Sequence, residues 1–156
     1  MTEEKNRLEI LRLEIDRLVM KYQLKECRYF FSHLYGVSEF CVLLAKKRGL
    51  NPEIAAACGM LHDIYQVTAG IPDNHAAKGA EEAEEILREL GLYDEGEISL
   101  ICDAIRTHSD KYNTYEGYAE ALIDADVLSH CLYNPDFPPE DKEVKRFGKL
   151  MDGFSS

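Results

Sequence analysis

Cys58-Gly59-Met60-Leu61-His62-Asp63-Ile64 is an apolar run in which a histidine and an aspartate stand side by side. An imidazole nitrogen and a carboxylate oxygen are both good ligands for divalent transition metals. A His-Asp pair alone is a weak signal, because the dipeptide occurs often by chance. The stretch therefore indicates a metal site only if other segments of the chain supply further ligands.

The apolar residues before this pair are predicted to form the central helix of the protein. Asn51-Pro52 marks its start, because asparagine is a favoured helix cap and proline fits the first helical turn. The residues that follow are small or apolar and allow neighbouring helices to approach closely; they include Ile54, Ala55, Ala57, Cys58 and Leu61. His62 and Asp63 then lie where this helix ends.

Apolar residues recur three and four positions apart along most of the remaining chain, which is typical of helices. We predict further helices over residues 2–24, 30–48, 75–90, 95–108, 118–132 and 139–152, and a loop over residues 65–74. No segment alternates between polar and apolar residues as a strand would. The 156 residues are therefore predicted to form one all-α domain of six or seven helices. Its core is expected at about residues 28–132, with residues 2–24 and 139–152 as peripheral helices.

Composition narrows the class of protein. The net charge of -11, from 29 acidic and 18 basic residues, disfavours binding to nucleic acid. Five cysteines without a CxxC pair are expected to be reduced, three of them as small core residues, rather than joined in disulfides. The N-terminus has no apolar signal segment, and no stretch is long enough to span a membrane. We therefore expect a soluble cytoplasmic protein that binds neither nucleic acid nor membranes.

Four of the five histidines lie at predicted ends of apolar helices. Together with two aspartates they form a set of nitrogen and oxygen ligands without a thiolate, which suits a catalytic site for Mn, Fe, Ni or Zn. The candidate ligands are His33, His62, Asp63, His75, His108 and Asp126. Each has an ordinary structural explanation when taken singly, such as a core histidine at position 33, but their joint occurrence favours a metal site.

Two aspartates of the helix at residues 118–132 compete for a place in this site. Asp124 and Asp126 are two residues apart and so diverge by roughly 200° around a helix, which prevents both from facing one metal ion. Asp126 is favoured because it shares its face with His130, four residues later. Asp124 is then either a supporting group or a surface charge, and His130 either orients Asp126 or has no role in the site.

The order of His33, His62-Asp63 and Asp126 resembles the H…HD…D pattern of the HD-domain superfamily of metal-dependent phosphohydrolases. The superfamily's last aspartate commonly follows an alanine and precedes an apolar residue, as Asp126 does in Ala125-Asp126-Val127-Leu128. The resemblance covers about residues 28–132. It implies a helical HD domain in which His33, His62, Asp63 and Asp126 hold a divalent metal ion.

His75 and His108 fall where members that bind two metal ions carry extra histidines. The stretches Asn74–Ala80 and Ala104–His108 look like the bacterial subgroup that includes symmetrical diadenosine tetraphosphate hydrolases. This resemblance implies a second ion held by His75 and His108, with Asp63 bridging the two ions. One departure is Ile64-Tyr65-Gln66, where many relatives have Ile-Gly-Lys. The missing lysine argues against the cyclic-nucleotide and cyclic-dinucleotide phosphodiesterase branches.

The resulting hypothesis is a phosphohydrolase that acts on a nucleotide or another phosphate ester or anhydride through a metal-bound hydroxide. His62 and Asp63 are the expected catalytic residues, and Lys78, Arg106 and Lys111 are the expected contacts to substrate phosphate. Two alternatives stay open: a di-iron oxygenase of the same superfamily, and a metal-binding helical sensor or scaffold without catalysis. The first helix packs either within the monomer or across a homodimer.

Overall fold

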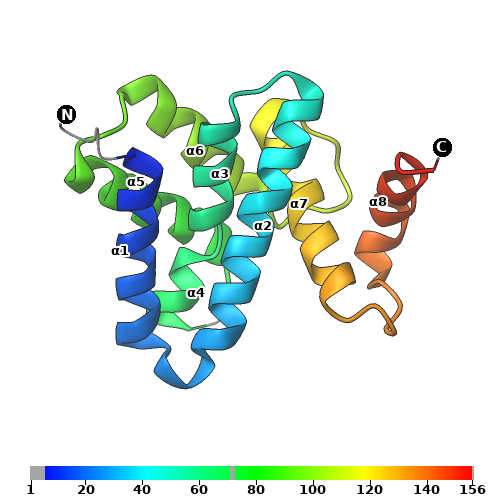
Figure 1. The fold of residues 1–156 in the computed structure, drawn as a ribbon, viewed down its shortest axis with the longest axis horizontal. Coiled ribbons are helices and arrows are strands. Elements are labelled where there is room, and N and C mark those ends of the chain that lie inside the picture. The colour runs from blue at the N-terminus through cyan, green and yellow to red at the C-terminus, as the bar shows by residue number, and fades with distance from the viewer. Residues whose placement is uncertain (1–5, 71–72, 156) are drawn as a thin grey trace.

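The structure of the chain, a computed structural model, describes residues 6–70 and 73–155. Within these residues it contains α-helices, one short 3-10 helix and no strand, which confirms the all-α prediction (Figure 1). The elements are α1 (Arg7–Tyr22), η1 (Leu24–Glu26), α2 (Cys27–Arg48), α3 (Pro52–Leu61), α4 (Ile64–Ala69), α5 (His75–Leu90), α6 (Glu95–Thr107), α7 (Gly117–Tyr133) and α8 (Asp141–Asp152). Seven of these helices lie where the sequence predicts them, and α4 is additional. The start predicted for the first helix, residues 2–5, lies outside the described residues.

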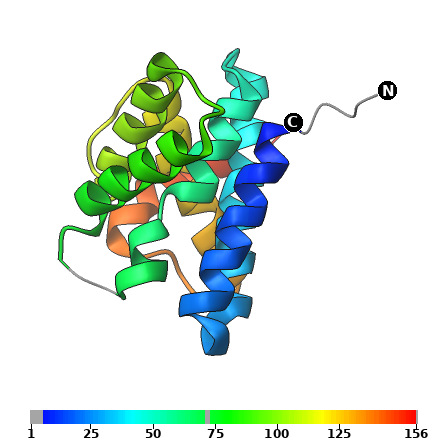
Figure 2. The same ribbon diagram turned by 90° about the vertical axis from the view of Figure 1, so that its left-hand side faces the viewer.

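Helix α3 is the centre of the fold, as its composition predicts. Every residue from Ile54 to Leu61 is buried, and α3 contacts α1, α2, α6 and α7. Figure 1 shows α3 beside the long helix α2, and Figure 2, seen from the α1 side, shows α5 and α6 on the flank opposite α1. The end of α3, where His62 and Asp63 lie, is therefore enclosed by helices from several parts of the chain.

The closest approach in the core is between α3 and α2 at Gly59. A Cβ atom at this position would lie 2.5 Å from the Cα atom and 2.6 Å from the backbone nitrogen of Ser38. The hydroxyl of Ser38 donates a hydrogen bond to the carbonyl oxygen of Ala56 at 2.9 Å, which ties the two helices at the same level. A glycine is therefore required one turn before His62, and it lets α2 come close enough to present its own histidine.

The short helix α4 corrects the predicted loop at residues 65–74. Ile64 and Val67, three positions apart, are both fully buried, and this spacing closes one more helical turn directly after Asp63. The helix stops at Gly70, whose φ of 86° lies in the left-handed region that favours glycine. Six residues are too few to show a helical period in the sequence. The remainder of the predicted loop includes residues 71 and 72, which lie outside the described residues.

The N-terminal helix packs within the chain's own core. Leu11, Ile15 and Val19 of α1 are fully buried, and α1 contacts α2, α3 and α4. Arg7 adds ion pairs to Glu53 and Glu97, at 2.5 and 2.8 Å. The sequence placed this helix at the periphery and left its packing partner open; in the structure its apolar stripe is part of the core.

Helix α8 lies at the opposite edge of the molecule, beside α7 (Figure 1). Glu143 is the residue of this helix that is buried. Arg146 joins α8 to α7 through ion pairs to Glu120 and Asp124. Among the residues that the structure describes, no helix has the length and apolar character needed to cross a membrane.

The contact at Gly59 predicts that Gly59→Ala strongly destabilises the protein. The added Cβ would overlap backbone atoms that cannot rotate away, so the cost should lie near the upper end of the overpacking range, about 3 kcal/mol in the free energy of unfolding. Urea denaturation measures this change. Gly148→Ala is the control, because a Cβ there meets open space on an exposed helix and should stabilise by about 0.5–1 kcal/mol. Equal effects of the two substitutions would refute the role of close packing at Gly59.

Candidate metal centre

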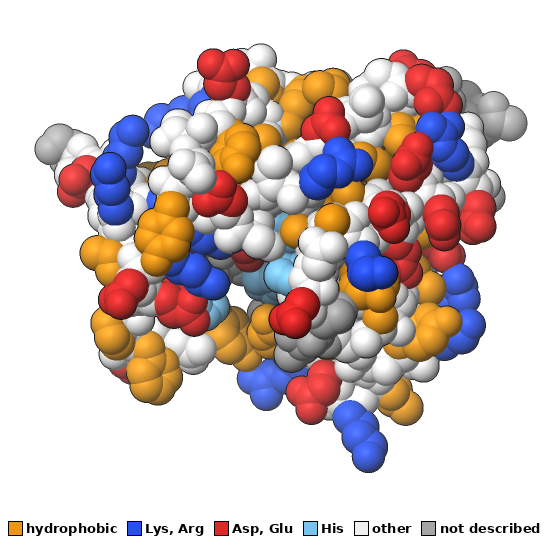
Figure 3. Space-filling view, turned by 180° about the vertical axis from the view of Figure 1, so that it is seen from behind, with side chains coloured by type: hydrophobic (Ala, Val, Ile, Leu, Met, Phe, Trp, Pro, Cys, Tyr) orange, Lys and Arg blue, Asp and Glu red, His pale blue; other side chains and the backbone are white. Residues whose placement is uncertain are grey.

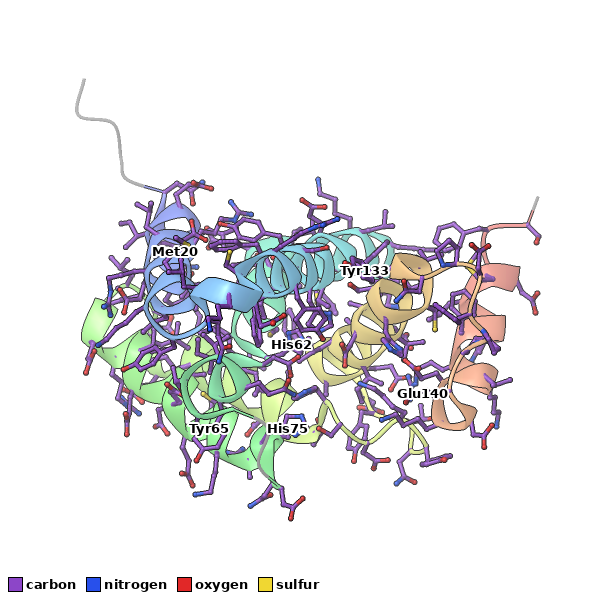
Figure 4. All side chains as sticks on the ribbon, turned by 90° about the horizontal axis from the view of Figure 1, so that it is seen from below. Met20, His62, Tyr65, His75, Tyr133 and Glu140 are labelled. Atoms are coloured by element: carbon purple, nitrogen blue, oxygen red, sulfur yellow. The ribbon has the colours of Figure 1, made fainter. Side chains whose placement is uncertain are left out.

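The candidate ligands come from five helices or helix ends. His33 belongs to α2, His62 and Asp63 follow α3, and Asp126 belongs to α7. The other two candidate ligands are His75, the first residue of α5, and His108, directly after α6. Figure 4 shows the labelled His62 near the centre of the molecule and the labelled His75 closer to the surface. The fold thus brings together residues that are up to about ninety positions apart, from His33 to Asp126.

Four donor atoms converge in the first group of ligands. His33 Nε2 lies 3.1 Å from His62 Nε2 and 3.0 Å from Asp63 Oδ2. Asp126 Oδ1 lies 3.3 Å from His33 Nε2 and 3.6 Å from His62 Nε2. Metal–nitrogen and metal–oxygen bonds of about 2.0–2.2 Å place ligand atoms roughly this far apart around one ion. The four atoms therefore have the spacing of a ligand cage.

The orientation of His62 shows that this cage fits a cation. Its Nδ1 donates a hydrogen bond to the carbonyl oxygen of Gly59 at 2.7 Å, so Nε2 of the neutral ring carries the lone pair. That lone pair faces the carboxylates of Asp63 and Asp126, which also accept. Only a proton or a metal ion placed between these atoms satisfies all of them. The chemistry of the donor set thus fits a divalent transition metal.

The close contacts between imidazoles and carboxylates also shift the pKa values of the first group of ligands. Burial disfavours the charged form of His62, but the nearby carboxylates of Asp63 and Asp126 outweigh burial and raise its pKa to about 10. Burial alone would raise the pKa of Asp63, yet His62, His108 and His33 hold it well below its usual value. Asp126 is likewise held low, with Lys111 as the largest favourable partner. The two carboxylates are therefore charged and attract a cation.

A second group of ligands shares Asp63 with the first. His108 Nε2 lies 3.2 Å from Asp63 Oδ1, while Asp63 Oδ2 faces His33 and His62. The Nδ1 atom of His108 donates to the carbonyl oxygen of Ile105 at 2.7 Å, which again turns the Nε2 lone pair toward the site. The two oxygens of Asp63 thus face different groups of imidazoles, as a bridging carboxylate would.

His75 lies next to the second group but outside its closest contacts. Its ring centroid is 5.3 Å from that of His108, and its Nε2 is 3.1 Å from the hydroxyl of Ser109. Partial burial and the neighbouring His108 lower its pKa, so the ring is neutral and able to act as a ligand. His75 would therefore have to move toward His108 and Asp63 to join them around one ion.

The candidate ligands other than the fully buried His62 line an open cavity of about 210 Å³. Figure 3 shows histidine side chains inside a hollow on this face of the molecule. The lining residues are Tyr29, His33, Asp63, Gln66, His75, His108, Ser109, Lys111, Asp126, His130, Glu140, Lys142 and Glu143. A buried group of ligands that opens to solvent on one side is typical of catalytic rather than structural metal sites.

Of the three cations predicted to bind phosphate, the structure brings Lys111 to the cavity. Its buried ammonium group donates to Asp126 Oδ2 at 2.5 Å and to the carbonyl oxygen of His108 at 2.7 Å. Arg106 pairs instead with Asp103 at 2.8 Å on the exposed side of α6. Arg106 and His108 are two residues apart, so they point in nearly opposite directions around the helix. Lys78 lies over the ring of Tyr65 and does not line the cavity.

The structure separates the two aspartates of α7 as the helical geometry predicts. Asp126 faces the ligands, whereas Asp124 pairs with Arg48 at 2.6 Å and Arg146 at 2.7 Å. The polar partner of His130 is Glu143 and not Asp126: His130 Nδ1 lies 2.8 Å from Glu143 Oε1. The supporting role considered for His130 toward Asp126 therefore has no basis in the contacts of the described residues.

Sequence reasoning missed one wall of the cavity. Glu140 directly precedes α8, and Lys142 and Glu143 lie in its first turn. The many charged residues of this segment predict a peripheral helix, and its apolar residues, such as Phe147 and Leu150, do not indicate that these charged residues line a cavity. Tyr29 was also missed, although its ring stacks on His33 at 5.7 Å between centroids and 6° between planes. Its position four residues before His33 on the same helix was a usable signal.

Comparison with known proteins places the chain among HD domains. The HD domain family matches residues 30–150. A solved structure described as a predicted HD superfamily hydrolase, from an uncultured Thermotogales bacterium, superposes with a TM-score of 0.60. It is 22% identical and the match covers 95% of this chain and 94% of that one. At this level of identity, the match to the solved structure supports the fold alone.

Curated relatives also resemble the chain in sequence. An uncharacterised protein of Clostridium beijerinckii is 34% identical over 114 residues, which is 69% of each chain. Ribonuclease Y of Opitutus terrae is 27% identical over 132 residues, covering 84% of this chain and 24% of that protein. Ribonuclease Y of Lactobacillus gasseri is 28% identical over 111 residues, or 70% of this chain and 19% of that protein. The chain thus spans a quarter or less of the ribonucleases Y that it matches.

The two aspartates of α7 supply a matched test of the metal centre. Loss of groups that only support metal ligands costs about 10–100-fold in metal affinity, so Asp126→Asn should weaken binding of Mn²⁺ or Zn²⁺ by at least that factor. Asp124→Asn should retain the affinity, because Asp124 pairs with arginines away from the cavity. Isothermal titration of metal-free protein measures both. Equal losses in the two variants would contradict the assignment of Asp126.

The buried pair of Lys111 and Asp126 gives a second test. Removing one partner of a buried ion pair costs about 3–5 kcal/mol, so Lys111→Met should destabilise the metal-free protein by a comparable amount. An added divalent ion should then stabilise the variant more than the wild type, because it replaces the lost countercharge of Asp126. Melting with and without chelator measures the difference. Lys142→Met, which removes an exposed side chain, is the control, and equal metal effects in Lys111→Met and wild type would refute the argument.

Proposed function

The chain belongs to the HD domain family, and from this premise we propose that it is a metal-dependent phosphohydrolase acting on a small phosphate ester or anhydride. One observation supports the proposal above all others: nitrogen and oxygen donors converge around both oxygens of Asp63 at the floor of an open cavity. Such a site offers ligands on the buried side and room for a substrate on the other. We infer two divalent ions per chain, drawn from Fe, Mn, Ni and Zn.

The candidate ligands are proposed to form two metal sites that share Asp63. His33, His62, Asp63 and Asp126 would hold one ion, and His75 and His108 would hold the other with Asp63. Ions in these positions would supply activated water and polarise the phosphoryl oxygen.

Hydrogen bonds from neighbouring residues hold the ligand side chains in their orientations. The carbonyl oxygens of Gly59 and Ile105 each accept from a histidine Nδ1 and set its orientation. Lys111 holds Asp126 through its second oxygen, Oδ2, and leaves Oδ1 directed at His33. The ligands are thus positioned before a substrate arrives, which favours catalysis over mere binding.

The size of the cavity limits the substrate. A volume of about 210 Å³ is below the range of about 300–1,000 Å³ for pockets that enclose whole organic ligands. We propose that the phosphate end of the substrate enters the cavity and that the remainder of the substrate stays outside it. Tyr29, which is 46% exposed and stacked on His33, offers an aromatic surface to that remainder. A nucleotide, with a phosphate and a base, has the matching chemistry.

The charge of the chain further narrows the substrate class. Ribonuclease Y, by its name, cleaves RNA, whose linkages are phosphate esters, and this relative supports the proposed reaction type. A net charge of -11 nevertheless disfavours a long polyanion. Among the described residues that line the cavity, Lys111 and Lys142 are the lysines. We therefore propose mononucleotides and dinucleoside polyphosphates as substrates, the latter because His75 and His108 resemble the extra histidines of the diadenosine tetraphosphate hydrolases.

Activity with defined metals tests the function. Metal-free protein loaded in turn with Mn²⁺, Fe²⁺, Ni²⁺ or Zn²⁺ should release phosphate or a nucleotide from at least one member of a panel of nucleoside phosphates, dinucleoside polyphosphates and aryl phosphate esters. Asp63→Asn should reduce turnover to background, because both groups of ligands lose their shared carboxylate. Asp103→Asn, on the exposed side of α6, should leave turnover unchanged.

Three outcomes would overturn the proposal. Full activity in Asp63→Asn would remove the metal centre from the mechanism. Tight metal binding without turnover of any phosphate compound would favour a sensor or scaffold. Oxygen consumption by the iron-loaded protein, again without phosphate release, would favour an oxygenase.

A further inference from the structure

The end of α7 carries a second set of metal-binding side chains that the centre described above does not use. One ligand atom from each of His130, Cys131 and Glu143 lies within 4.8 Å of the other two. His130 and Cys131 are consecutive on α7, and Glu143 comes from α8. The set shares no residue with the ligands around Asp63, although His130 and Glu143 line the same cavity.

The burial of Glu143 is the unusual feature of this set. Glu143 is 2% exposed, whereas the other residues of α8 are exposed or partly exposed. A buried carboxylate is costly unless it is paired with a cation or with hydrogen-bond donors. Glu143 Oε1 lies 2.8 Å from Nδ1 of His130, whose side chain is itself 52% exposed. Phe147 and Leu150 of α8 already pack partly buried against the core, so α8 does not need a buried acid to hold it in place. The burial of Glu143 is therefore an added cost that a bound cation would offset.

The third member completes a donor set of distinct chemistry. Cys131 is 7% exposed and lies beside an imidazole and a carboxylate. Thiolate, imidazole and carboxylate together are typical ligands of Zn²⁺. Bonds of about 2.3 Å to sulfur and about 2.0–2.1 Å to nitrogen require ligand atoms roughly 3–4 Å apart. The ligand atoms lie within 4.8 Å of one another, so a closure of less than about 2 Å brings them to this spacing.

We propose that His130, Cys131 and Glu143 bind a zinc ion that clamps α8 to α7 at the rim of the cavity. On binding, the Cys131 thiol releases its proton to solvent and coordinates as the thiolate. Water completes the fourth position on the exposed side of His130. The clamp fixes the start of α8, where Glu140 and Lys142 line the cavity; Figure 4 labels Glu140 at this wall. The rim ion thus sets the shape of the opening through which a ligand reaches the centre.

Cobalt spectroscopy distinguishes this rim site from the centre around Asp63. Co²⁺ bound to a thiolate gives a charge-transfer band in the near ultraviolet, and the centre around Asp63 has no thiolate. Co²⁺ added to reduced, metal-free protein should produce this band in the wild type and also in His62→Ala. Cys131→Ser should abolish the band, and Glu143→Gln, which removes a ligand, should weaken Co²⁺ binding at this site by at least the roughly 10–100-fold that loss of a supporting group costs. Zn²⁺ added afterwards should remove the band.

Two controls make the result decisive. Cys27→Ser changes a partly exposed cysteine of α2 and should retain the band. Circular dichroism of the metal-free variants shows whether each is folded, and Cys131→Ser decides the question if Glu143→Gln does not fold. Absence of the band in wild type that takes up Co²⁺ at its other ligands would overturn the proposal. So would a band that survives in Cys131→Ser. Because His62→Ala keeps the rim site, failure of the hydrolase function would leave this test intact.

Discussion

The rest of the site depends on one interaction, the hydrogen bond from His62 Nδ1 to the carbonyl oxygen of Gly59. It is made within the last turn of the most buried helix, and it leaves the Nε2 lone pair with acceptors as neighbours. A neutral imidazole facing two carboxylates in a buried position is unfavourable unless a cation lies between them. The fold therefore favours a positive charge at this point, which is either a proton on His62, whose pKa is raised to about 10, or a metal ion that replaces this proton.

Close packing at the same residue gives the site its second histidine. Gly59 allows the backbone of α2 to approach α3 at Ser38, and His33 lies on α2 between one and two turns earlier. Its Nε2 atom can then come within 3.1 Å of His62 Nε2. A larger residue at position 59 would separate the helices and the two imidazoles with them. The glycine that shapes the core and the histidines that bind the ion are thus parts of one geometric constraint.

The sequence predicts the parts of the structure that rest on local periodicity. The helix ends at Asn51, Gly49 and Gly91 appear as expected, with Asn51 capping α3 through its side chain. The turn per residue of a helix showed that Asp124 and Asp126 could not both face one ion, and the resemblance to the HD pattern favoured Asp126; the shared face with His130 was a weaker reason, because His130 contacts Glu143 instead. By contrast, α4 was too short to show a period. Glu143 could not be recognised as buried, because the burial of one charged residue on α8 depends on where α7 lies.

Electrostatics explains why this site can dispense with the lysine that many relatives carry after the His-Asp pair. Asp63 and Asp126 bring two negative charges and Lys111 brings one positive charge that is already committed to Asp126. Once His62 is deprotonated, as metal binding requires, these residues alone would repel a phosphate, and Gln66 at the missing lysine's position does not alter the balance. One divalent ion reverses the sign of the site, and a second makes it strongly attractive to phosphate. In a chain of net charge -11, metal occupancy would then control both the proposed chemistry and the access of an anionic substrate, whereas fixed lysines would attract anions whether or not the metal is bound.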